Sequence, residues 1–331
     1  MSTLALTGPL AGQPQNPLPL RLRLRAWWNG QDPRDLTPPK RQAHPMPMTP
    51  READTVAATA AEPENAPAVV KPWLAERIAF VERLWGEGFH TPGGAEHVLE
   101  LVRPLNLDES MTMLELGCGL GGCARTVAQT LGTWCTGVEW SPGLALAGVE
   151  RSTRAGLVKK AAIQFHPADR MALKGNAYNR VFSKEALFTI PDKQIAIQGI
   201  ADTLKSGGEL CFTDYVSTCD PASSVDLRTW QEREPLGAHP WTLEKYLVVL
   251  ASHGFDVRVT DDITEKHCQL IRDGWRRLVE EIKPGSVGPE LMPIMVREAE
   301  VWARREALLR MGELRVYRFF ALKPQRDPTA F

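Results

Sequence analysis

The chain has 331 residues, of which 43% are hydrophobic, enough for one large core or two modest ones. Its formal net charge of −1 excludes the global basic excess typical of nucleic-acid-binding proteins and the acidic excess of solvating tails. The six cysteines lack the CxxC spacing and the density of a disulfide scaffold, which favours a reducing, cytoplasmic setting. No run of about 18 apolar residues predicts a membrane-spanning helix, and the N-terminus lacks the residue order of a secretory signal.

Residues 1–70 are predicted to form a disordered, proline-rich tail, since half of the 26 prolines precede residue 73 and no periodicity is sustained there. Within this tail, Leu18–Trp28 alternates leucine with arginine and ends on two tryptophans. The pattern fits a short strand-like or docking segment. It also fits a peripheral anchor on an anionic membrane surface or on an acidic protein partner.

An ordered domain is predicted over residues 71–331. Apolar residues at three- and four-residue intervals predict a helix over residues 73–86 and a second helix over Ala95–Val102. The glycine-rich stretch between them, Gly86–Gly94, predicts a loop. Five apolar runs then predict buried strands, at Thr112–Leu116, Trp134–Val138, Ala161–Phe165, Arg180–Phe182 and Leu210–Thr213.

Helical patterns separate these strands, at residues 121–131, 142–155 and 192–204. Such alternation predicts an α/β fold with a Rossmann-like, doubly wound, mostly parallel sheet. After the fifth strand we expect a helix, a strand, a helical lid insert and a last strand, at residues 242–253, 255–260, about 263–311 and 314–322. The last strand alternates and packs aromatic residues, as the late antiparallel strand of such a sheet does.

A glycine-rich turn follows the first predicted strand, in the segment Glu115–Gly122. Open parallel sheets bind ligands at the carboxyl ends of their strands, so this turn is a candidate site. Glycine allows a tight turn and a close approach of the backbone to a ligand, and the amides at the start of the next helix favour polar or anionic ligand atoms. The spacing also fits the dinucleotide fingerprint, so the turn by itself leaves the cofactor open. Its candidate cofactor contacts are Gly117, Cys118, Gly119 and Gly121.

Glu115, two residues before the first glycine, narrows the choice of cofactor. A carboxylate at a buried strand end needs a partner, so we expect it to bond the loop amides or a cationic ligand group. S-adenosylmethionine carries an ammonium and a sulfonium group, whereas the pyrophosphate of NAD is anionic and would be repelled. The acid therefore favours S-adenosylmethionine over NAD.

Polar residues follow the other four predicted strands as well. Glu139 lies 22 residues beyond Gly117 and can accept bonds from both ribose hydroxyls, with Trp140 against the adenine face. Asp169 follows the third strand, where an adenine amino group can donate to it. The candidate cofactor contacts at these strand ends are Glu139, Trp140, Asp169, Arg170 and Ser183.

Acids and glycines in this order make the chain similar to the class I methyltransferase family, over about Ala79 to Lys323. Glu115–Gly121 resembles the family's acid-x-Gly-x-Gly-x-Gly signature, Glu139 its ribose acid, and Asp169 its adenine-side acid. The resemblance implies S-adenosylmethionine as the cofactor.

Within the family, three stretches resemble the phosphoethanolamine and small-amine N-methyltransferase group, at Glu82–Phe89 with Gly93 and Gly94, Phe182–Thr189, and Leu210–Tyr215. The chain departs from that group at Thr189, where the group has a histidine partnered with a tyrosine. It departs again at Pro235–Trp241, where the group has an arginine and tyrosines for the phosphate. The helical insert, with Trp275 and Trp302, looks more like the lids of enzymes that methylate larger or more apolar acceptors. Core packing is the alternative for both tryptophans.

The expected activity is S-adenosylmethionine-dependent methyl transfer to a small-molecule or lipid-like acceptor, by an in-line displacement. A protonated acceptor needs a base, for which the candidates are Glu185, Tyr215 and His90. An NAD-dependent oxidoreductase and a non-catalytic cofactor-binding module are the alternatives. No metal site is predicted. A nucleic-acid partner is not expected, because no Asn/Asp-Pro-Pro-aromatic tetrad follows the fourth strand.

Overall fold

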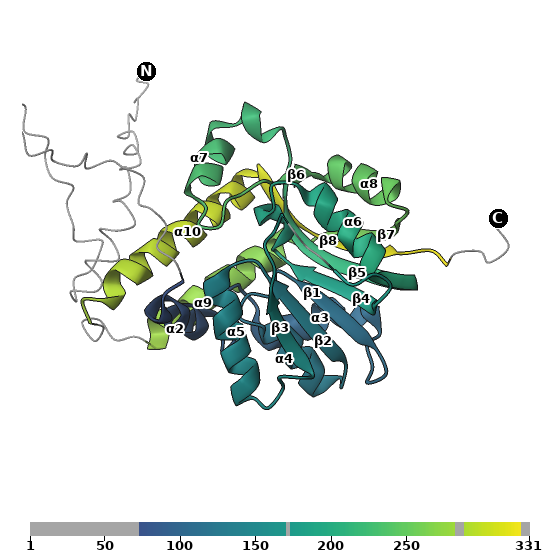
Figure 1. Ribbon diagram of the computed structural model, residues 1–331. Coiled ribbons are helices and arrows are strands. Elements are labelled where there is room, and N and C mark those ends of the chain that lie inside the picture. Colours follow the sequence, from purple (N-terminus) through teal and green to yellow (C-terminus); the bar gives the residue numbers. More distant parts are fainter. Residues whose placement is uncertain (1–72, 170–172, 282–287, 326–331) are drawn as a thin grey trace, which may run out of the picture.

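The computed structural model describes residues 73–169, 173–281 and 288–325 of the chain. The predicted tail over residues 1–70, its Leu18–Trp28 segment and the candidate cofactor contact Arg170 lie outside the described residues. Figure 1 shows the described part as a sheet with helices on both faces and a further group of helices at one end.

The described strands are β1 (Thr112–Leu116), β2 (Trp134–Glu139), β3 (Ala161–Phe165), β4 (Tyr178–Lys184), β5 (Leu204–Ser217), β6 (Trp241–Thr242), β7 (Asp256–Asp262) and β8 (Leu314–Leu322). Their order is β3-β2-β1-β4-β5-β8-β7, with β6 beside β5. β8 runs antiparallel to both of its neighbours, and the other described pairs are parallel. The chain order reverses between β1 and β4, where such sheets bind ligands. The predicted Rossmann-like sheet with a late antiparallel strand is confirmed.

Alternate strand residues serve two cores, one on each face of the sheet. In β1, Met113 joins one hydrophobic cluster and Leu114 the other. The Leu114 face is covered by α6 (Lys193–Thr203) and α8 (Leu243–Ser252). The Met113 face is covered by α3 (Gly94–Val102), α4 (Gly122–Thr130) and α5 (Pro142–Arg154). Strands that are buried on both faces are mostly apolar, so the apolar runs of the sequence predicted their positions.

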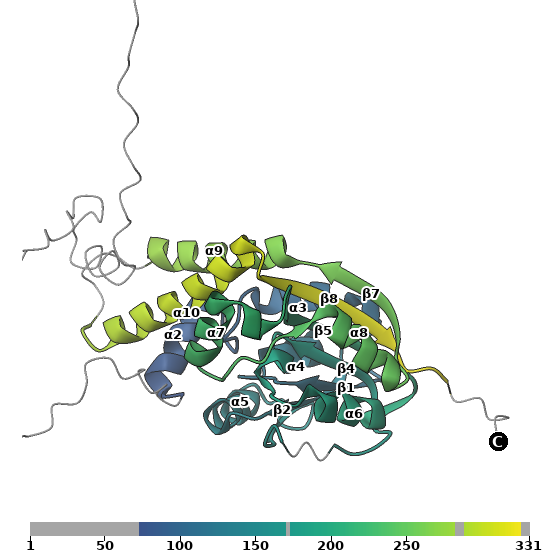
Figure 2. The ribbon, with the colours of Figure 1, turned by 90° about the horizontal axis from the view of Figure 1, so that it is seen from above.

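The remaining helices pack against one another at one end of the sheet (Figure 2): α2 (Ala75–Trp85), α7 (Val225–Arg233), α9 (Thr264–Glu281) and α10 (Leu291–Met311). The predicted insert thus contains two helices, α9 and α10, between β7 and β8. Trp302 of α10 packs edge to face on Trp85 of α2, with ring centroids 4.8 Å apart. This contact fixes α10 beside the first helix of the domain.

Several elements differ from the prediction: β4 extends beyond Arg180–Phe182 at both ends, β7 spans Asp256–Asp262 in place of residues 255–260, and β6 was not predicted. β5 is longer than the predicted run Leu210–Thr213, because it pairs with β8 from Glu209 to Ser217. α7 was not predicted, because it buries two residues, Leu227 and Trp230, which are too few to give a periodic pattern.

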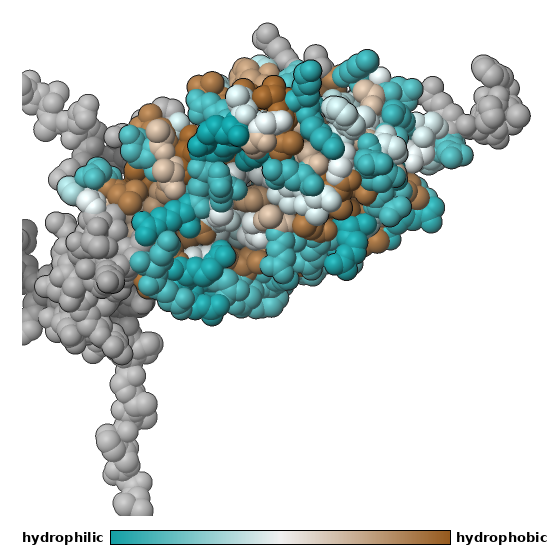
Figure 3. All heavy atoms as spheres, turned by 90° about the horizontal axis from the view of Figure 1, so that it is seen from below, coloured by the Kyte–Doolittle hydropathy of each residue, from teal (hydrophilic) through white to brown (hydrophobic). Residues whose placement is uncertain are grey.

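None of the described helices is long and apolar enough to cross a membrane. Figure 3 shows polar and apolar side chains mixed over the face seen from below. Exposed large apolar residues such as Leu146 and Val248, which are 64% and 62% exposed, are ordinary on protein surfaces. The unusual chemistry of the described residues lies instead in an interior cavity.

Candidate functional site

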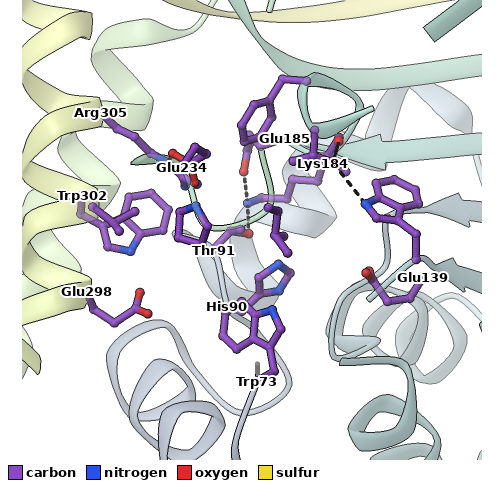
Figure 4. A pocket seen from close by; sticks show the side chains of 18 of the residues that line it. Trp73, His90, Thr91, Glu139, Lys184, Glu185, Glu234, Glu298, Trp302 and Arg305 are labelled. Carbon is purple, nitrogen blue, oxygen red and sulfur yellow. Dashed lines mark hydrogen bonds and ion pairs between the residues drawn. The ribbon is translucent and has the colours of Figure 1, made fainter. Parts of the chain in front are cut away.

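A pocket lies between the carboxyl edge of the sheet and helix α10 (Figure 4). Helix α10 contributes Glu298, Trp302 and Arg305, and the loop between α2 and α3 contributes His90 and Thr91. The sheet side contributes Gly117, Glu139, Trp140, Lys184, Glu185 and Ala186.

The turn after β1 requires glycine for two reasons. Gly117, Gly119 and Gly121 have φ angles of 67°, 53° and 73°, in the left-handed region that favours glycine. In addition, a Cβ on Gly117 would stand 2.2 Å from the Cβ of Ala186, and one on Gly119 would stand 2.1 Å from Cε1 of His90. This turn, the glycine cradle, packs so closely against Ala186 and His90 that any larger residue would displace them.

Glu139, at the end of β2, lines the cavity and is 3% exposed. Its Oε2 accepts a hydrogen bond from the Gly119 amide at 2.7 Å, and its Oε1 accepts one from the Ser141 amide at 2.7 Å. Burial raises the pKa of Glu139 to about 7. The carboxylate thus ties β2 to the glycine turn and presents oxygens to hydroxyl donors in the cavity.

Glu115 is also 3% exposed, and its Oε2 accepts a hydrogen bond from the Ala124 amide in the first turn of α4 at 2.9 Å. Burial raises the pKa of Glu115 to about 8. Glu115 and Cys118 line a smaller space, which shares His90 and Lys184 with the main cavity. The acid therefore anchors α4 and reaches the space beside the glycine turn.

The other predicted cofactor contacts are placed differently from one another. Trp140 lines the cavity and donates from Nε1 to Oγ1 of Thr189 at 3.1 Å. Ser183 is fully buried and donates to the Leu116 carbonyl at 2.9 Å, so its hydroxyl ties β4 to β1. Asp169 is exposed after β3 and is not among the residues that line either space.

Glu185 follows β4 and lines the cavity with a φ of 43°. Left-handed backbone at a residue other than glycine is uncommon and clusters at functional sites. Its carboxylate accepts hydrogen bonds from Lys184 Nζ at 2.6 Å and from Thr213 Oγ1 at 2.9 Å. Burial would raise the pKa of Glu185, but the Lys184 ammonium and His267 bring it down to about 2. Glu185 is therefore ionised at neutral pH.

Tyr215, on β5, is fully buried, and its hydroxyl lies 2.7 Å from Nε2 of His267 on α9. Nδ1 of His267 lies 3.9 Å from Oε1 of Glu185 and has no hydrogen-bond partner. Burial raises the pKa of Tyr215 and lowers the pKa of His267 to about 4. A neutral, hydrogen-bonded pair of Tyr215 and His267 therefore lies next to the carboxylate of Glu185. No sequence pattern pointed to His267, because it comes from the insert and only the fold brings it here.

His90 lies against Gly119 and lines both spaces. The ring of Trp73 packs edge to face on it, with centroids 5.7 Å apart. Burial lowers the pKa of His90 to about 3, so its imidazole is neutral at pH 7. Figure 4 shows His90 between Trp73 and Thr91, at the base of the cavity.

Two ion pairs in the cavity were not predicted from the sequence. Arg77 of α2 donates from Nε to Oε1 of Glu298 on α10 at 2.6 Å. Arg305 of α10 donates from two nitrogens to the carboxylate of Glu234, next to the end of α7. These side chains come from helices and from a helix end, whereas the polar residues that the sequence singled out mostly follow predicted strands. Of the residues that the sequence singled out in the insert, Trp302 lies beside these ion pairs in the cavity.

Residues 107–257 match a family model described as a methyltransferase domain. Phosphoethanolamine N-methyltransferase 1 of Zea mays is 26% identical over 202 residues, which are 60% of this chain and 39% of that protein. The chain spans about two fifths of the length of these curated plant relatives, the phosphoethanolamine N-methyltransferases of Zea mays and Arabidopsis thaliana.

Solved structures share the fold. Phosphoethanolamine N-methyltransferase 2 of Haemonchus contortus superposes with a TM-score of 0.65 at 22% identity, covering 75% of this chain and 57% of that one. A putative sarcosine dimethylglycine methyltransferase from Galdieria sulphuraria superposes with a TM-score of 0.61 at 20% identity. The superposition covers 75% of this chain and 98% of that one. The matched domain and the shared fold make the chain similar to class I S-adenosylmethionine-dependent methyltransferases and, among them, to the phosphoethanolamine N-methyltransferase group.

Proposed function

We propose that the chain binds S-adenosylmethionine at the glycine cradle and methylates a small-molecule acceptor held in the cavity under α10. The observation that carries this proposal is Glu139, a buried acid at the end of β2 that is bonded to Gly119 and open to the cavity. Carboxylate oxygens in this place suit the two hydroxyl groups of a ribose. The Haemonchus contortus neighbour was solved in complex with S-adenosyl-L-methionine.

The residues around the cradle fit this cofactor. Gly117 and Gly119 keep the turn tight, with Ala186 and His90 packed directly against it. Trp140 offers a ring for the adenine, and Glu115 lines the space beside the turn as a second buried acid. When bound, S-adenosylmethionine supplies a methyl group that its sulfonium has already activated.

The chain's own residues align the acceptor and take its proton. Orientation of this kind can contribute several kcal/mol. Glu185 and His90 line the cavity in their basic forms at neutral pH, because their pKa values are about 2 and 3. Each therefore has a free position for a proton that an acceptor releases, although a pKa this far below 7 makes each a weak base. Tyr215 holds the imidazole of His267 by its hydroxyl, and His267 adds a polar neighbour behind Glu185.

Calorimetric titration of the full chain with S-adenosylhomocysteine and with NADH tests the proposal. We expect S-adenosylhomocysteine to bind and NADH not to bind. Glu139→Ala should weaken S-adenosylhomocysteine binding by about tenfold or more, since a charged hydrogen-bond acceptor contributes about 1.5–3 kcal/mol. NADH binding without S-adenosylhomocysteine binding would contradict the proposal and favour an oxidoreductase on the same turn.

A further inference from the structure

The cations of the cavity are all compensated within the protein. Seven charged side chains line it, at Arg77, Glu139, Lys184, Glu185, Glu234, Glu298 and Arg305. An ammonium has three protons to donate, and Nζ of Lys184 donates to Thr91 Oγ1 at 2.9 Å, to the Pro92 carbonyl at 2.9 Å and to Glu185 Oε2 at 2.6 Å. Lys184 therefore has no donor left for a ligand.

Each of the two arginines bonds a carboxylate through the edge of its guanidinium and lies against an aromatic ring. Arg77 bonds Glu298 and lies 3.8 Å from the ring centroid of Trp73. Arg305 bonds Glu234 and lies 4.5 Å from the ring centroid of Trp302. A carboxylate and an aromatic face together satisfy a guanidinium well. Once Glu139 is assigned to the cofactor, each remaining carboxylate has one of these cations as its partner.

Two neutral donors of the cavity are fully buried and lack a partner. Among the described residues that line it, the indole Nε1 atoms of Trp73 and Trp302 are buried and have no hydrogen-bond partner. Trp302 is 3% exposed, and Figure 4 shows its ring reaching from α10 into the cavity between Arg305 and Glu298. A buried donor without a partner is unfavourable, so these positions suit an acceptor atom from a ligand. Apolar side chains complete this wall, at Phe188, Pro235, Leu236 and Val301.

We propose that the methyl acceptor is an uncharged, mainly apolar molecule whose oxygen atom accepts a hydrogen bond from the indole N–H of Trp302. A phosphate monoester or an ammonium compound would bring a charge into a buried space where the opposite charges are already paired, which is costly. This inference rests on the proposed methyl transfer. It separates the chain from the relatives that are named for phosphoethanolamine.

Labelled methyl transfer into extracts separated by charge tests the inference. A metabolite and lipid extract is divided by ion exchange at pH 7 into anionic, cationic and uncharged fractions, and each receives the full chain and methyl-labelled S-adenosylmethionine. Phosphoethanolamine alone is a fourth sample. We expect the uncharged fraction to take up about tenfold more label than any other sample, which corresponds to a difference of about 1.4 kcal/mol.

Greater labelling of phosphoethanolamine or of a charged fraction would overturn the inference and leave the methyl transfer standing. If no sample is labelled although S-adenosylhomocysteine binds, the proposed methyl transfer fails, and the inference fails with it.

A pair of tryptophan variants tests the hydrogen bond itself. Trp302→Phe keeps an aromatic ring and removes the N–H. The apparent KM, measured as the amount of the uncharged fraction that gives half-maximal labelling, should rise about fivefold, because one neutral hydrogen bond contributes about 1 kcal/mol. Trp85→Phe is the matched control: its indole N–H is also buried without a partner and its ring contacts Trp302, but it does not line the cavity. An unchanged KM in Trp302→Phe, or the same rise in both variants, would overturn the inference. Thermal unfolding of both variants checks that they fold.

Discussion

At the scale of single residues, the cradle depends on Gly119. In Gly119→Ala the new Cβ would meet the His90 ring at 2.1 Å, in a backbone conformation with a φ of 53°. We expect the affinity for S-adenosylhomocysteine to fall about tenfold or more, because both the turn and the close approach to the backbone are disturbed. Gly156→Ala is the matched control, since Gly156 has a φ of 69° but nothing within 4 Å of its Cβ position. Equal losses of affinity in the two variants would contradict a role of Gly119 in binding.

Glu185 gives a second prediction at this scale. Glu185→Gln keeps the shape of the side chain but removes the charge that faces Lys184 and His267. We expect turnover, measured as label transferred into the extract, to fall about a hundredfold, the usual contribution of a positioned acid–base group. Cofactor affinity, measured by calorimetry, should stay near that of the unmodified chain. Thr213→Val, which removes one hydrogen bond to the carboxylate but keeps its charge, should have a smaller effect. Full activity of Glu185→Gln would remove Glu185 from the mechanism.

At the scale of elements, α10 is positioned by buried ion pairs. Arg77 on α2 and Glu298 on α10 have side chains that are 10% and 5% exposed. Removing one partner leaves a buried charge without compensation, so Glu298→Ala should lower the free energy of unfolding by about 3–5 kcal/mol. The double variant Arg77→Met, Glu298→Met should recover most of this loss, because no charge is left unpaired. Urea unfolding measures both, and a double variant less stable than Glu298→Ala would contradict this account.

Some helices and strands could be located from sequence patterns, and others could not. β1, β3 and β8 have the bounds that their apolar runs or alternation predicted. The turn at Glu115–Gly122 could also be predicted, because glycines and an acid directly after a buried strand are typical of a turn that binds a ligand. α7 could not, since an element that buries two residues leaves too weak a pattern.

At the scale of the whole molecule, two buried acids make stability depend on pH. Burial raises the pKa values of Glu115 and Glu139 to about 8 and about 7, above the ordinary value of 4.5. The folded state therefore holds protons that the unfolded state releases. The resulting stabilisation is fully present below about pH 4.5 and is lost as the pH rises through 7 and 8.

Glu139→Gln isolates one of these acids. Between pH 5 and pH 8.5, the unfolding free energy of the unmodified chain should fall relative to that of the variant by about 3 kcal/mol, at 1.36 kcal/mol for each pKa unit. Thermal unfolding of the two ligand-free proteins across this range gives the comparison. A difference in Tm that does not change with pH would contradict the raised pKa.

The sequence by itself determined the sheet, the glycine turn and the acids that follow β1 and β2. These features depend on local rules: burial on both faces makes strands apolar, and a tight turn over a ligand needs glycine. The cavity around them was decided by the tertiary structure. Arg77, Glu234, His267, Glu298 and Arg305 are polar residues on helices or helix ends, where charge is ordinary, and they become unusual only when the fold buries them together. The cofactor could therefore be inferred from spacing along the chain, whereas the character of the acceptor depends on which charges and indole groups the helices bring face to face.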